Sequence, residues 1–407
     1  MKIYLKRIKF AWKNIWRNRR RSGATMGVTA MGVTGLLFFG GFALYTYESL
    51  EEFSARQQGH VVLSHANFYA QNEEKPMQHG VEDWEKIRAD LKSNTDVRQV
   101  LPRIEFTGLI SNGDKSSIFV GSGVDACYEF TVTGPFLEVT QGEVLNPDSD
   151  MPTIMLGKGL AQQFGTHIGD SLTLLTTTVD GTLNGVDAKV VGIFGTGVPE
   201  MDQRKLYVSL NVAQNLIATR RVSTLSVYLK NTALTMAYVD KLKQRYPQLA
   251  TRSWDELATF YHGVRNLYDR IFAVMGFVIV IVVLLSIINT IGMTVVERTR
   301  EIGTLAALGA LPGELLFNFV IEAAMIGVIG SAIGMLVAGG ITLSLFYGNV
   351  MMPPPPGMTQ GYPLRIAFSS ALYAKTALAM LAITIVGAYF AARKGVRKPI
   401  VEALAHV

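Results

Sequence analysis

The stretch TVVERTREIGTLAALGALPGELLFNFVIE, residues 294–322, decides how the rest of the chain is organised. It lies between two apolar runs, 271–296 and 317–346, each long enough to cross the hydrocarbon core of a membrane as a helix. Its first part concentrates charge within five positions, at Glu297, Arg298, Arg300 and Glu301. We therefore expect a short polar connection at a membrane surface.

The same stretch contains residues typical of the end of one helix and the start of another. Gly309 is typical of a helix end and Pro312 of a helix start, and the apolar Ile302, Leu305 and Leu308 precede them. A short helix of this kind at a membrane surface is suited to dock on a partner protein. We predict that it couples a soluble partner, which supplies the driving force, to the membrane part of the chain.

The composition places the chain in a membrane. Of its 407 residues, 49% are hydrophobic and only 17% are charged, below the roughly 25% charged residues of ordinary soluble domains. The net charge of +6 is concentrated locally, because residues 1–22 carry nine Lys and Arg and no acid. Residues 48–270 carry 21 basic and 27 acidic residues, which gives −6. This distribution argues against a nucleic-acid-binding protein.

The basic N-terminus predicts an amphipathic helix. Its apolar residues recur at helical steps, whereas Lys and Arg occupy the other positions. A helix of this kind lies in an anionic membrane surface. The apolar residues are Leu5, Ile8, Trp12, Ile15 and Trp16.

We expect an α-helical membrane protein with four transmembrane helices and a mixed α/β extracytoplasmic domain. Basic residues flank the first and last spans, so both termini are expected in the cytoplasm. The glycine-rich first and third spans, which include the GxxxG pair Gly330 and Gly334, predict close helix packing. Glu322 lies near the end of the third span, where we expect it to extend to the interface; a coupling role is the alternative. The segments are a cytoplasmic basic helix 1–22, spans 23–47, 271–296, 317–346 and 371–392, an extracytoplasmic domain 48–270, a coupling helix and turn 297–316, an extracytoplasmic Pro-rich loop 347–370 and a cytoplasmic tail 393–407.

Residues 48–270 alternate strand-like and helix-like patterns. The strongest local signal is Asn112-Gly113 between two strand-like runs, which predicts a β-hairpin. Helices are expected near 81–91, 159–164, 212–217 and 233–246. Ser253 or Asp255 can cap a further helix that continues towards the second span.

No constellation in the sequence points to catalysis or to a resident metal. Cys127 is the single cysteine and cannot form a disulfide within the chain. His60 and His65 are five residues apart in a strand-like run, so they face opposite sides. Gly108 and Gly113 have the spacing of a phosphate-binding loop, but Asp114 separates them from the following Lys and Ser. We predict that this chain does not hydrolyse ATP by itself.

The chain resembles the FtsX/MacB-type permeases of ATP-binding-cassette (ABC) transporters. ERTREIGTLAALGA at 297–310 matches their ERxREIGxLRALGA signature, and the order of one span, a large domain and three spans is their layout. Ala306 departs from the family, which usually has a basic residue there. The resemblance implies a coupling helix seated on a separate ATPase through Glu297, Arg298, Arg300, Glu301, Ile302, Gly303, Leu305, Leu308 and Gly309.

The extracytoplasmic domain is similar to that of the lipoprotein-releasing permeases of the LolC/LolE type. The similarity lies in IMLGKGLAQQFGTHIGDSLTLLTTTVDG at 154–181 and GIFGTGVPEMDQRKLYVSL at 192–210. It implies a bacterial inner-membrane location, a cytoplasmic ATPase dimer that binds ATP and Mg²⁺, and a second permease subunit, identical or different. It also implies a periplasmic carrier or effector protein and contact with membrane lipid.

Three functions remain open from the sequence. The first is extraction of lipoprotein or lipid through an apolar cavity between spans of two subunits. The second is mechanotransmission, in which ATP-driven motion works an efflux duct or activates a cell-wall hydrolase. The third, a membrane-bound enzyme, has no supporting motif. The first predicts a cavity near the outer membrane surface, with lining residues Tyr45, Tyr47, Phe260, Tyr261, Leu267 and Phe272.

Overall fold

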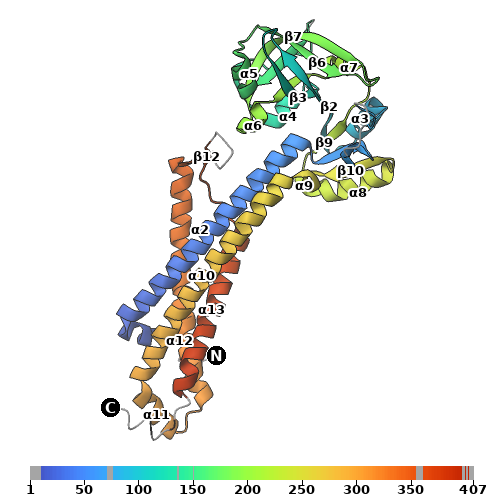
Figure 1. Ribbon diagram of the computed structural model, residues 1–407. Coiled ribbons are helices and arrows are strands. Elements are labelled where there is room, and N and C mark those ends of the chain that lie inside the picture. Colours follow the sequence, from blue (N-terminus) through green and yellow to red (C-terminus); the bar gives the residue numbers. More distant parts are fainter. Residues whose placement is uncertain are drawn as a thin grey trace. The chain divides into compact units, whose positions relative to one another are not determined.

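A computed structural model of the chain describes residues 11–70, 77–134, 137–149, 151–353, 361–396, 399 and 402 (Figure 1). The chain divides into two compact units. The helical unit holds Met1–Glu48, Gly263–Met351 and Pro363–Val407. The sheet unit holds Ser49–His262 and Met352–Tyr362.

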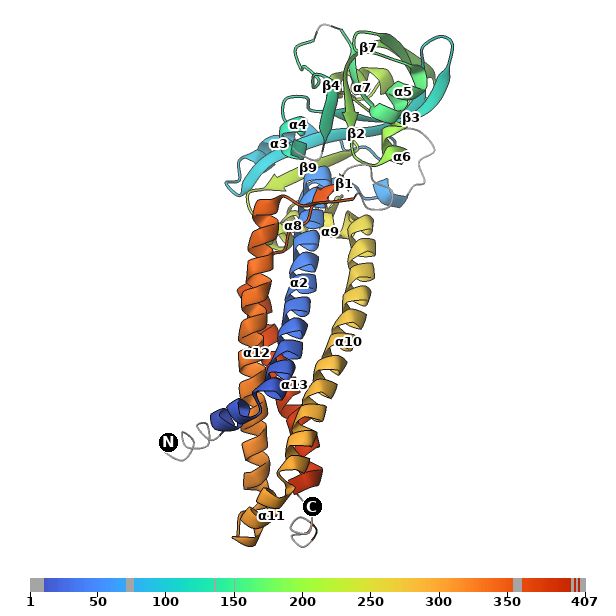
Figure 2. The ribbon, with the colours of Figure 1, turned by 90° about the vertical axis from the view of Figure 1, so that its left-hand side faces the viewer.

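Four helices are long and apolar enough to cross a membrane by length and composition, as predicted. α2 and α10 contain 40 and 39 residues, about 60 Å each at 1.5 Å per residue. This length is roughly twice the thickness of a hydrocarbon core, so both helices extend beyond their apolar parts. Figure 2 shows the four helices side by side in the helical unit. They are α2 (Arg19–Gln58), α10 (Thr259–Glu297), α12 (Pro312–Gly348) and α13 (Ser370–Val396).

The short helix α11 (Thr299–Ala307) joins α10 to α12. Gly309 ends it with φ +96, a left-handed conformation that favours glycine. The N–H groups of Gly309 and Ala310 donate to the carbonyls of Ala306 and Leu305, which is the Schellman arrangement. α12 then begins at Pro312, so the predicted stop and start are confirmed.

Close packing holds the helical unit together. A Cβ added to Gly334 would lie 2.6 Å from the carbonyl oxygen of Ala30, and one added to Gly330 would lie 2.9 Å from Cβ of Thr29. The predicted GxxxG contact is therefore confirmed, and its partner is α2. Thr25 and Thr290 also join α2 to α10, with 2.5 Å between their hydroxyl oxygens.

The two ends of this unit are only partly described. Residues 1–10 of the predicted amphipathic helix lie outside the described residues, and 11–17 are helical before a turn at Asn18. Most of the predicted tail 393–407 and residues 354–360 of the Pro-rich loop also lie outside them. Short strands β11 (Met351–Met352) and β12 (Tyr362–Pro363) pair across that loop.

A ten-stranded mixed sheet forms the body of the sheet unit. Its order is β10-β1-β9-β2-β3-β8-β5-β7-β4, and β6 pairs with both β2 and β7. Pairing is antiparallel except for β3 with β8 and β5 with β7. The strands are β1 (Val61–His65), β2 (Val97–Ser111), β3 (Ser116–Val124), β4 (Glu138–Gly142), β5 (Thr153–Gly157), β6 (Ser171–Thr177), β7 (Leu183–Gly195), β8 (Lys205–Ser209), β9 (Thr224–Leu229) and β10 (Leu249–Ser253).

Helices cover the sheet and complete one large apolar core. Leu160 of α5 and Leu216 of α7 are buried in this core together with strand residues such as Ile104 and Val227. The mixed α/β domain predicted from the sequence is therefore present. Its helices are η1 (Phe68–Ala70), α3 (Trp84–Lys92), α4 (Glu129–Thr133), α5 (Lys158–Phe164), α6 (Pro199–Asp202), α7 (Leu210–Ile217), η3 (Thr232–Leu234), α8 (Thr235–Arg245) and α9 (Trp254–Leu257).

Local predictions in this unit hold with small changes at the boundaries. β2 and β3 form the predicted hairpin, with Gly113 at φ +95 in its turn. The helix expected from residue 81 begins only at Trp84, because Val81 forms an isolated bridge with Val222. Ser253, rather than Asp255, caps the helix that follows β10. That helix ends at Leu257, and α10 starts as a separate helix at Thr259.

Candidate functional site

Two buried ionic groups stand out, one in each unit. The first lies at the start of the predicted coupling segment. Nη1 of Arg298 is 3.4 Å from Oε2 of Glu322 on α12, and the two side chains are 8% and 4% exposed. Nδ2 of Asn14 donates to the same carboxylate oxygen at 3.5 Å. Nε and Nη2 of Arg298 are buried without a hydrogen-bond partner among the described residues.

The prediction that Glu322 extends to the interface is wrong. Its side chain is buried and pairs with Arg298. The physical reason is that an ionised carboxylate inside a bundle is costly unless a cation lies against it. Glu322 therefore ties the end of α10 to the body of α12.

A second ion pair ties the same end of α10 to α2. Arg21 donates to both carboxylate oxygens of Glu297, at 2.9 and 2.7 Å. Such a two-point pair fixes geometry as well as charge. Arg17 lies 3.9 Å from Glu301, a longer and exposed contact. Two neighbouring residues, Glu297 and Arg298, thus hold α11 against α2 and α12.

The structure divides the predicted coupling residues into two faces. Three of them face inward, since Arg298 is 7% and Ile302 is 6% exposed and Gly303 is buried. Ile302 belongs to the core of the helical unit and therefore cannot be the apolar anchor for a partner that the sequence suggested. The outward residues are Glu297, Arg300, Glu301, Leu305, Leu308 and Gly309.

The outward face of α11 offers apolar side chains beside charge. Leu305 is 44% and Leu308 81% exposed, and Leu311 just beyond the turn is 66% exposed. Leu311 was not among the predicted residues. It follows the turn set by Gly309, so only the folded loop reveals that it continues the same apolar patch. Exposed apolar side chains that lie beside charged ones are suited to contact a partner protein.

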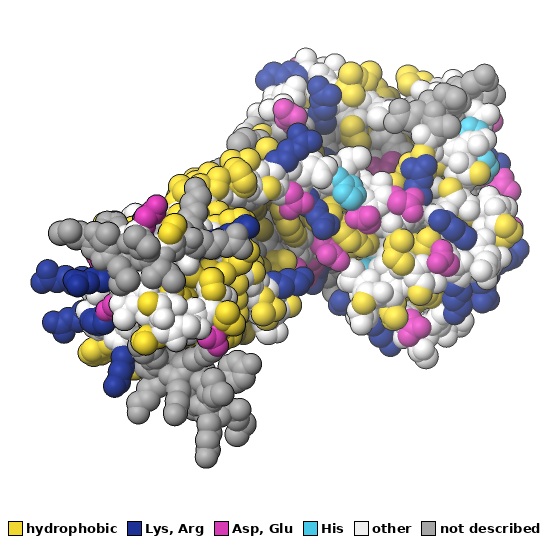
Figure 3. Space-filling model, turned by 90° about the horizontal axis from the view of Figure 1, so that it is seen from below, with side chains coloured by type: hydrophobic (Ala, Val, Ile, Leu, Met, Phe, Trp, Pro, Cys, Tyr) yellow, Lys and Arg dark blue, Asp and Glu magenta, His cyan; other side chains and the backbone are white. Residues whose placement is uncertain are grey.

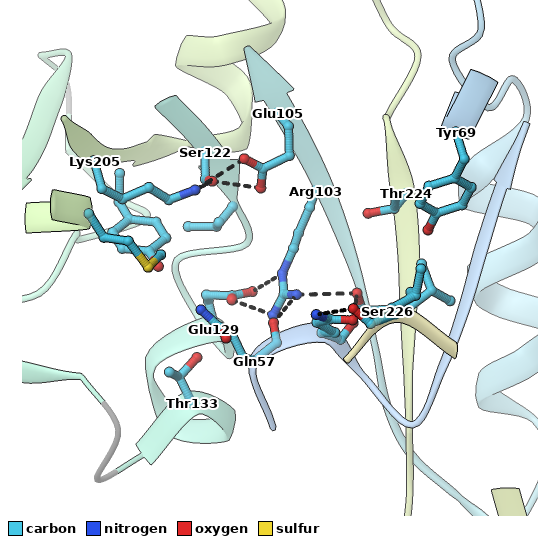
Figure 4. Close-up of a pocket in the computed structure, with 16 residues that line it drawn as sticks. Gln57, Tyr69, Arg103, Glu105, Ser122, Glu129, Thr133, Lys205, Thr224 and Ser226 are labelled. Carbon is cyan, nitrogen blue, oxygen red and sulfur yellow. Dashed lines mark hydrogen bonds and ion pairs between the residues drawn. The ribbon is translucent and has the colours of Figure 1, made fainter. Parts of the chain in front are cut away.

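The second buried ionic group lies in the sheet unit and centres on Arg103 of β2. Its Nη2 lies 2.6 Å from Oε1 of Glu129, and its Nε donates to Oε2 at 3.2 Å. Nη1 donates to the carbonyl of Gln57 at 2.5 Å and to Oγ of Ser226 at 3.3 Å. Nη2 is also 2.7 Å from the hydroxyl of Tyr228. Figure 4 shows Arg103 pointing at Glu129, Gln57 and Ser226.

These side chains cap the C-terminal end of α2. The last carbonyls of a helix have no partner within the helix. Here Tyr228 donates to the carbonyl of Arg56 at 2.9 Å, Arg103 to that of Gln57, and Ser226 to that of Gln58 at 2.6 Å. Three side chains from β2 and β9 therefore fasten the end of α2 to the sheet.

Burial and charge shift the titration of this group. Burial would lower the pKa of Arg103, but the charge of Glu129 and its hydrogen bonds raise this pKa above its ordinary value. Burial raises the pKa of Tyr228 to about 12, and burial also raises the pKa of Tyr207. The tyrosines therefore stay neutral and the guanidinium stays charged at physiological pH.

A cavity of about 500 Å³ opens beside Arg103. Across it from the capping group, Nζ of Lys205 is 3.1 Å from Oε2 of Glu105, and Ser122 donates to Glu105 at 2.6 Å. The lining mixes these paired polar groups with Val62, Met201 and other apolar side chains. Among the lining residues no hydroxyl or thiol is paired with a histidine, and the hydroxyl of Ser122 lies against Nζ of Lys205.

The predicted cavity residues do not form one group. Tyr45, Tyr47, Leu267 and Phe272 belong to the helical unit, whereas Phe260 and Tyr261 belong to the sheet unit. Tyr261 is 3% exposed and packs on Trp254 with 5.4 Å between ring centroids, so it is not available to line a cavity. Phe260 and Leu267 are exposed.

The helical unit contains an aromatic cluster that the sequence did not single out. Phe272 contacts Phe39 and Phe42 of α2, with ring centroids 6.1 and 6.5 Å apart. Tyr268 joins both Phe42 and Phe272. Tyr47 donates to Asp269 at 2.6 Å and so adds a polar tie between the same two helices. A helical spacing of aromatic residues along α2 and α10 was the available signal.

Two family descriptions match the chain. "MacB-like periplasmic core domain" matches residues 22–245, and "FtsX-like permease C-terminal" matches residues 273–400. The first covers more than half of the chain. Together they include most of the sheet unit and part of each of the four long helices.

Similar curated proteins include lipoprotein-releasing and macrolide-export permeases. The lipoprotein-releasing system transmembrane protein LolC of Xylella fastidiosa is 25% identical over 79% of this chain and 75% of its own length. The corresponding LolE of Haemophilus influenzae is 24% identical over 79% and 76%. The macrolide export ATP-binding/permease protein MacB of Pasteurella multocida is 29% identical, over 38% of this chain and 25% of its own length.

Proposed function

Because the chain belongs to the FtsX/MacB family of ABC transporter permeases, we propose that it is the membrane subunit of a transporter that releases lipoproteins from the bacterial inner membrane. It is a membrane protein with a periplasmic domain, and it resembles both Lol and MacB proteins. Hydrolysis of ATP belongs to a separate ATPase that binds ATP and Mg²⁺. The chain itself transmits the motion.

One observation carries the choice of substrate. The similarity to LolC runs over 79% of this chain, whereas the similarity to MacB is confined to 38%. A similarity over 79% of the chain includes parts of both units. Since the extracytoplasmic domain is where a released lipoprotein would pass to a carrier, the length of the LolC similarity supports lipoprotein release.

The exposed face of α11 supports docking on an ATPase. Leu305, Leu308 and Leu311 would supply the buried anchor of the contact, and Arg300 with Glu301 would orient it. The exposed Glu297 and the buried Arg298 hold α11 to α2 and α12 through ion pairs. A push on α11 is therefore felt by two membrane helices.

The exposed side of α10 supports a second permease subunit. In its apolar window only 11% of residues are buried, against 39% in α2 and in α12. Acyl chains of a lipoprotein would enter between two such faces, near Leu267 and Phe272. The exposed apolar side chains of α10 include Leu267, Ile271, Val274, Phe277, Val278, Ile281, Val282 and Leu285.

Mechanotransmission without lipid extraction is the second candidate. The close contacts of Gly330 and Gly334 with α2 favour it, because tightly packed helices move as one body. The capping of α2 by Arg103 favours it equally. In that case the sheet unit would work an efflux duct or activate a periplasmic hydrolase.

Purification of the intact complex from its native membranes tests the proposal. Mass spectrometry should find the ATPase, a second permease subunit and lipid-anchored proteins, and ATP should release the lipid-anchored proteins. A complex that contains only the ATPase and a hydrolase or duct protein would favour mechanotransmission. A charge reversal at Arg300 and Glu301 should remove transport-coupled ATP hydrolysis while the permease still inserts.

A further inference from the structure

Residues 11–21, which we call the N-terminal arm, form a bent helical segment with three polar side chains on one side. Residues 11–17 are helical, and after a turn the chain continues as α2. Asn14, Arg17 and Arg21 follow one another at steps of three and four residues, which are the steps of one helix face. The three side chains can therefore reach the same neighbouring segment.

The buried side of the arm anchors it in the helical unit. Ala11 and Ile15 are 2% and 5% exposed. Asn14 lies between them in the chain and is 5% exposed, and its Nδ2 donates to the buried carboxylate of Glu322 at 3.5 Å. A buried amide that donates to a buried carboxylate is costly to displace. This side therefore fixes the position of the arm along α12 without its arginines.

The two arginines of the same series contact the coupling segment, residues 297–316. Arg21 donates to both carboxylate oxygens of Glu297, at 2.9 and 2.7 Å, which fixes the orientation of the two side chains. Nη1 of Arg17 lies 3.9 Å from Oε1 of Glu301. Glu297 precedes α11, and Glu301 lies in the first turn of α11. The arm thus contacts the coupling segment on either side of the start of α11.

The charges of the two segments are complementary. The arm carries five Lys and Arg and no acid, whereas the coupling segment carries three Glu and two Arg. Two of these glutamates, Glu297 and Glu301, contact the arm. Figure 3 shows Lys and Arg side chains at this end of the helical unit, with Asp and Glu side chains among them. Opposite charges arranged in this way favour one register between two segments.

We infer that the N-terminal arm is a brace for α11, and that Arg17 and Arg21 are positioning residues for the coupling of ATP hydrolysis to the membrane helices. The inference rests on the proposed docking of an ATPase on α11. Leu305 and Leu308 face outward from α11, so their position depends on what holds α11 in place. Since three contacts along one face oppose sliding between the two segments, the arm and α11 move as one body. A push on α11 then reaches α2 through the arm.

Stimulation of ATP hydrolysis by the permease tests the role of Arg21 without any lipoprotein. The full chain in lipid nanodiscs is titrated with the ATPase that co-purifies with it, and the rate of hydrolysis is compared with that of the ATPase alone. Arg21→Glu places two carboxylates against each other and should lower the maximal stimulation about threefold, within the range expected for partly exposed charges. Exchange of the charges, Arg21→Glu with Glu297→Arg, should restore most of the stimulation. Arg20→Glu, at the neighbouring exposed position, is the control and should leave it unchanged.

Two results of this titration would overturn the inference. One is an equal loss in Arg20→Glu, or no recovery in the exchanged variant. The other is an unchanged maximal rate with a higher concentration of ATPase at half-saturation, because Arg21 would then bind the ATPase itself. A wild-type chain that does not stimulate the ATPase would instead count against the proposed function, and cross-linking then decides the inference.

Cross-linking of the arm to α11 tests the contact without an ATPase. Arg17→Cys with Glu301→Cys is made in the full chain with Cys127→Ser, so that only the two new thiols are present. A short thiol-specific cross-linker is added to membranes, and mass spectrometry measures the yield. We expect a high yield for this pair and a low yield for Arg20→Cys with Glu301→Cys.

The cross-linked permease should stimulate ATP hydrolysis as well as the same variant without cross-linker, because a brace does not have to open. A low yield for the pair at 17 and 301 would overturn the inference. So would a linked permease that no longer stimulates the ATPase, because the contact would then be a lock that must open.

Discussion

The two buried Arg–Glu pairs of this permease resemble each other in burial but differ in bonding. In the sheet unit the side chains of Arg103 and Glu129 are 10% and 5% exposed, and every guanidinium nitrogen has a partner. In the helical unit Arg298 and Glu322 are 8% and 4% exposed, but only Nη1 of Arg298 is bonded. The distances differ accordingly, 2.6 Å against 3.4 Å.

The difference in bonding indicates which contact of α2 or α11 is fixed and which one can move. A buried polar network in which every group is satisfied loses several hydrogen bonds when its geometry changes. Arg298 has two unbonded donors and would gain partners in another arrangement. The Arg103 group therefore fastens α2 to the sheet, whereas the Arg298 group holds α11 with fewer bonds, as the proposed ATP-driven motion of α11 requires.

The largest expected effect is on the free energy of unfolding and comes from substitution in the Arg103–Glu129 pair. Arg103→Met leaves Glu129 buried without its cation and uncaps Gln57, so the unfolding free energy should fall by about 3–5 kcal/mol. Fluorescence of Trp84 and Trp254, both in the sheet unit, reports the melting of the full-length protein in detergent. Arg103→Met with Glu129→Met should recover roughly half of the loss, because no unpaired charge remains. An unchanged melting temperature in the single variant would refute the capping role.

The next largest expected effect is on ATP hydrolysis and comes from substitution in the Arg298–Glu322 pair. Glu322→Gln leaves the buried Arg298 charge unpaired, and we expect transport-coupled ATP hydrolysis to fall at least tenfold while the melting of the sheet unit is unchanged. A tenfold loss corresponds to about 1.4 kcal/mol. Exchange of the two charges, Arg298→Glu with Glu322→Arg, should restore part of the rate. Glu314→Gln, at an exposed position on the same helix, is the control. An equal loss of ATP hydrolysis in this variant would show that the loss does not come from breaking the Arg298–Glu322 pair.

Helix packing gives a smaller effect with a control on the same helix. Gly334→Val forces a side chain against the backbone of Ala30, and overpacking of this kind costs about 1–3 kcal/mol. Gly339→Val meets no atom within 4 Å and should be tolerated. The heat resistance of the purified permease, followed by size-exclusion chromatography, should fall only for Gly334→Val. Equal behaviour of the two variants would contradict the contact with α2.

The smallest expected effect is a pH dependence of stability that comes from His60 in the sheet unit. Burial, with the charges of Arg56 and Arg98, lowers the pKa of His60, whose Nδ1 accepts the N–H of Leu229 at 3.3 Å. The folded state therefore binds fewer protons than the unfolded state below about pH 6.5, and stability should fall as the pH drops through that value. The slope cannot exceed about 1.4 kcal/mol per pH unit.

His60→Gln should flatten this dependence, as measured by urea unfolding between pH 5 and 7.5 (about the range in which histidine titrates). The ring of His60 lies 6.1 Å from that of Tyr228, so acidification should weaken the capping group first. A wild-type protein whose stability is constant over this range would contradict the assignment.

Much of the fold was predictable because its signals are local. Four apolar runs, the Asn112-Gly113 turn and the stop at Gly309 each depend on a few adjacent residues. Gly330 and Gly334 were recognised by their spacing alone, although glycines at 339 and 340 in the same span meet no neighbour. The spacing of glycines predicts that they share one face of a helix, but it does not indicate whether another helix packs against that face.

The buried ionic groups could not be predicted, because they join residues far apart in the chain. Three helices must pack before Asn14, Arg298 and Glu322 come together. In the sequence, Glu322 therefore indicated only an energetically costly charge near a membrane surface. Arg103 and Glu129 come from a strand and a short helix with no motif around them. Ile302 was assigned to the partner contact, since periodicity cannot distinguish an inward from an outward leucine or isoleucine on an amphipathic helix.

Release of a lipoprotein from vesicles measures whether ATP hydrolysis drives lipoprotein release through this permease. The complex of this permease with the proposed ATPase and second subunit is reconstituted with the lipoprotein, and soluble lipoprotein is measured in the presence of a periplasmic carrier. We expect release with ATP but not with a non-hydrolysable analogue, and at least a tenfold loss for Leu308→Asp on the exposed face of α11. Release that needs no ATP, or that is unaffected by Leu308→Asp, would contradict the proposal.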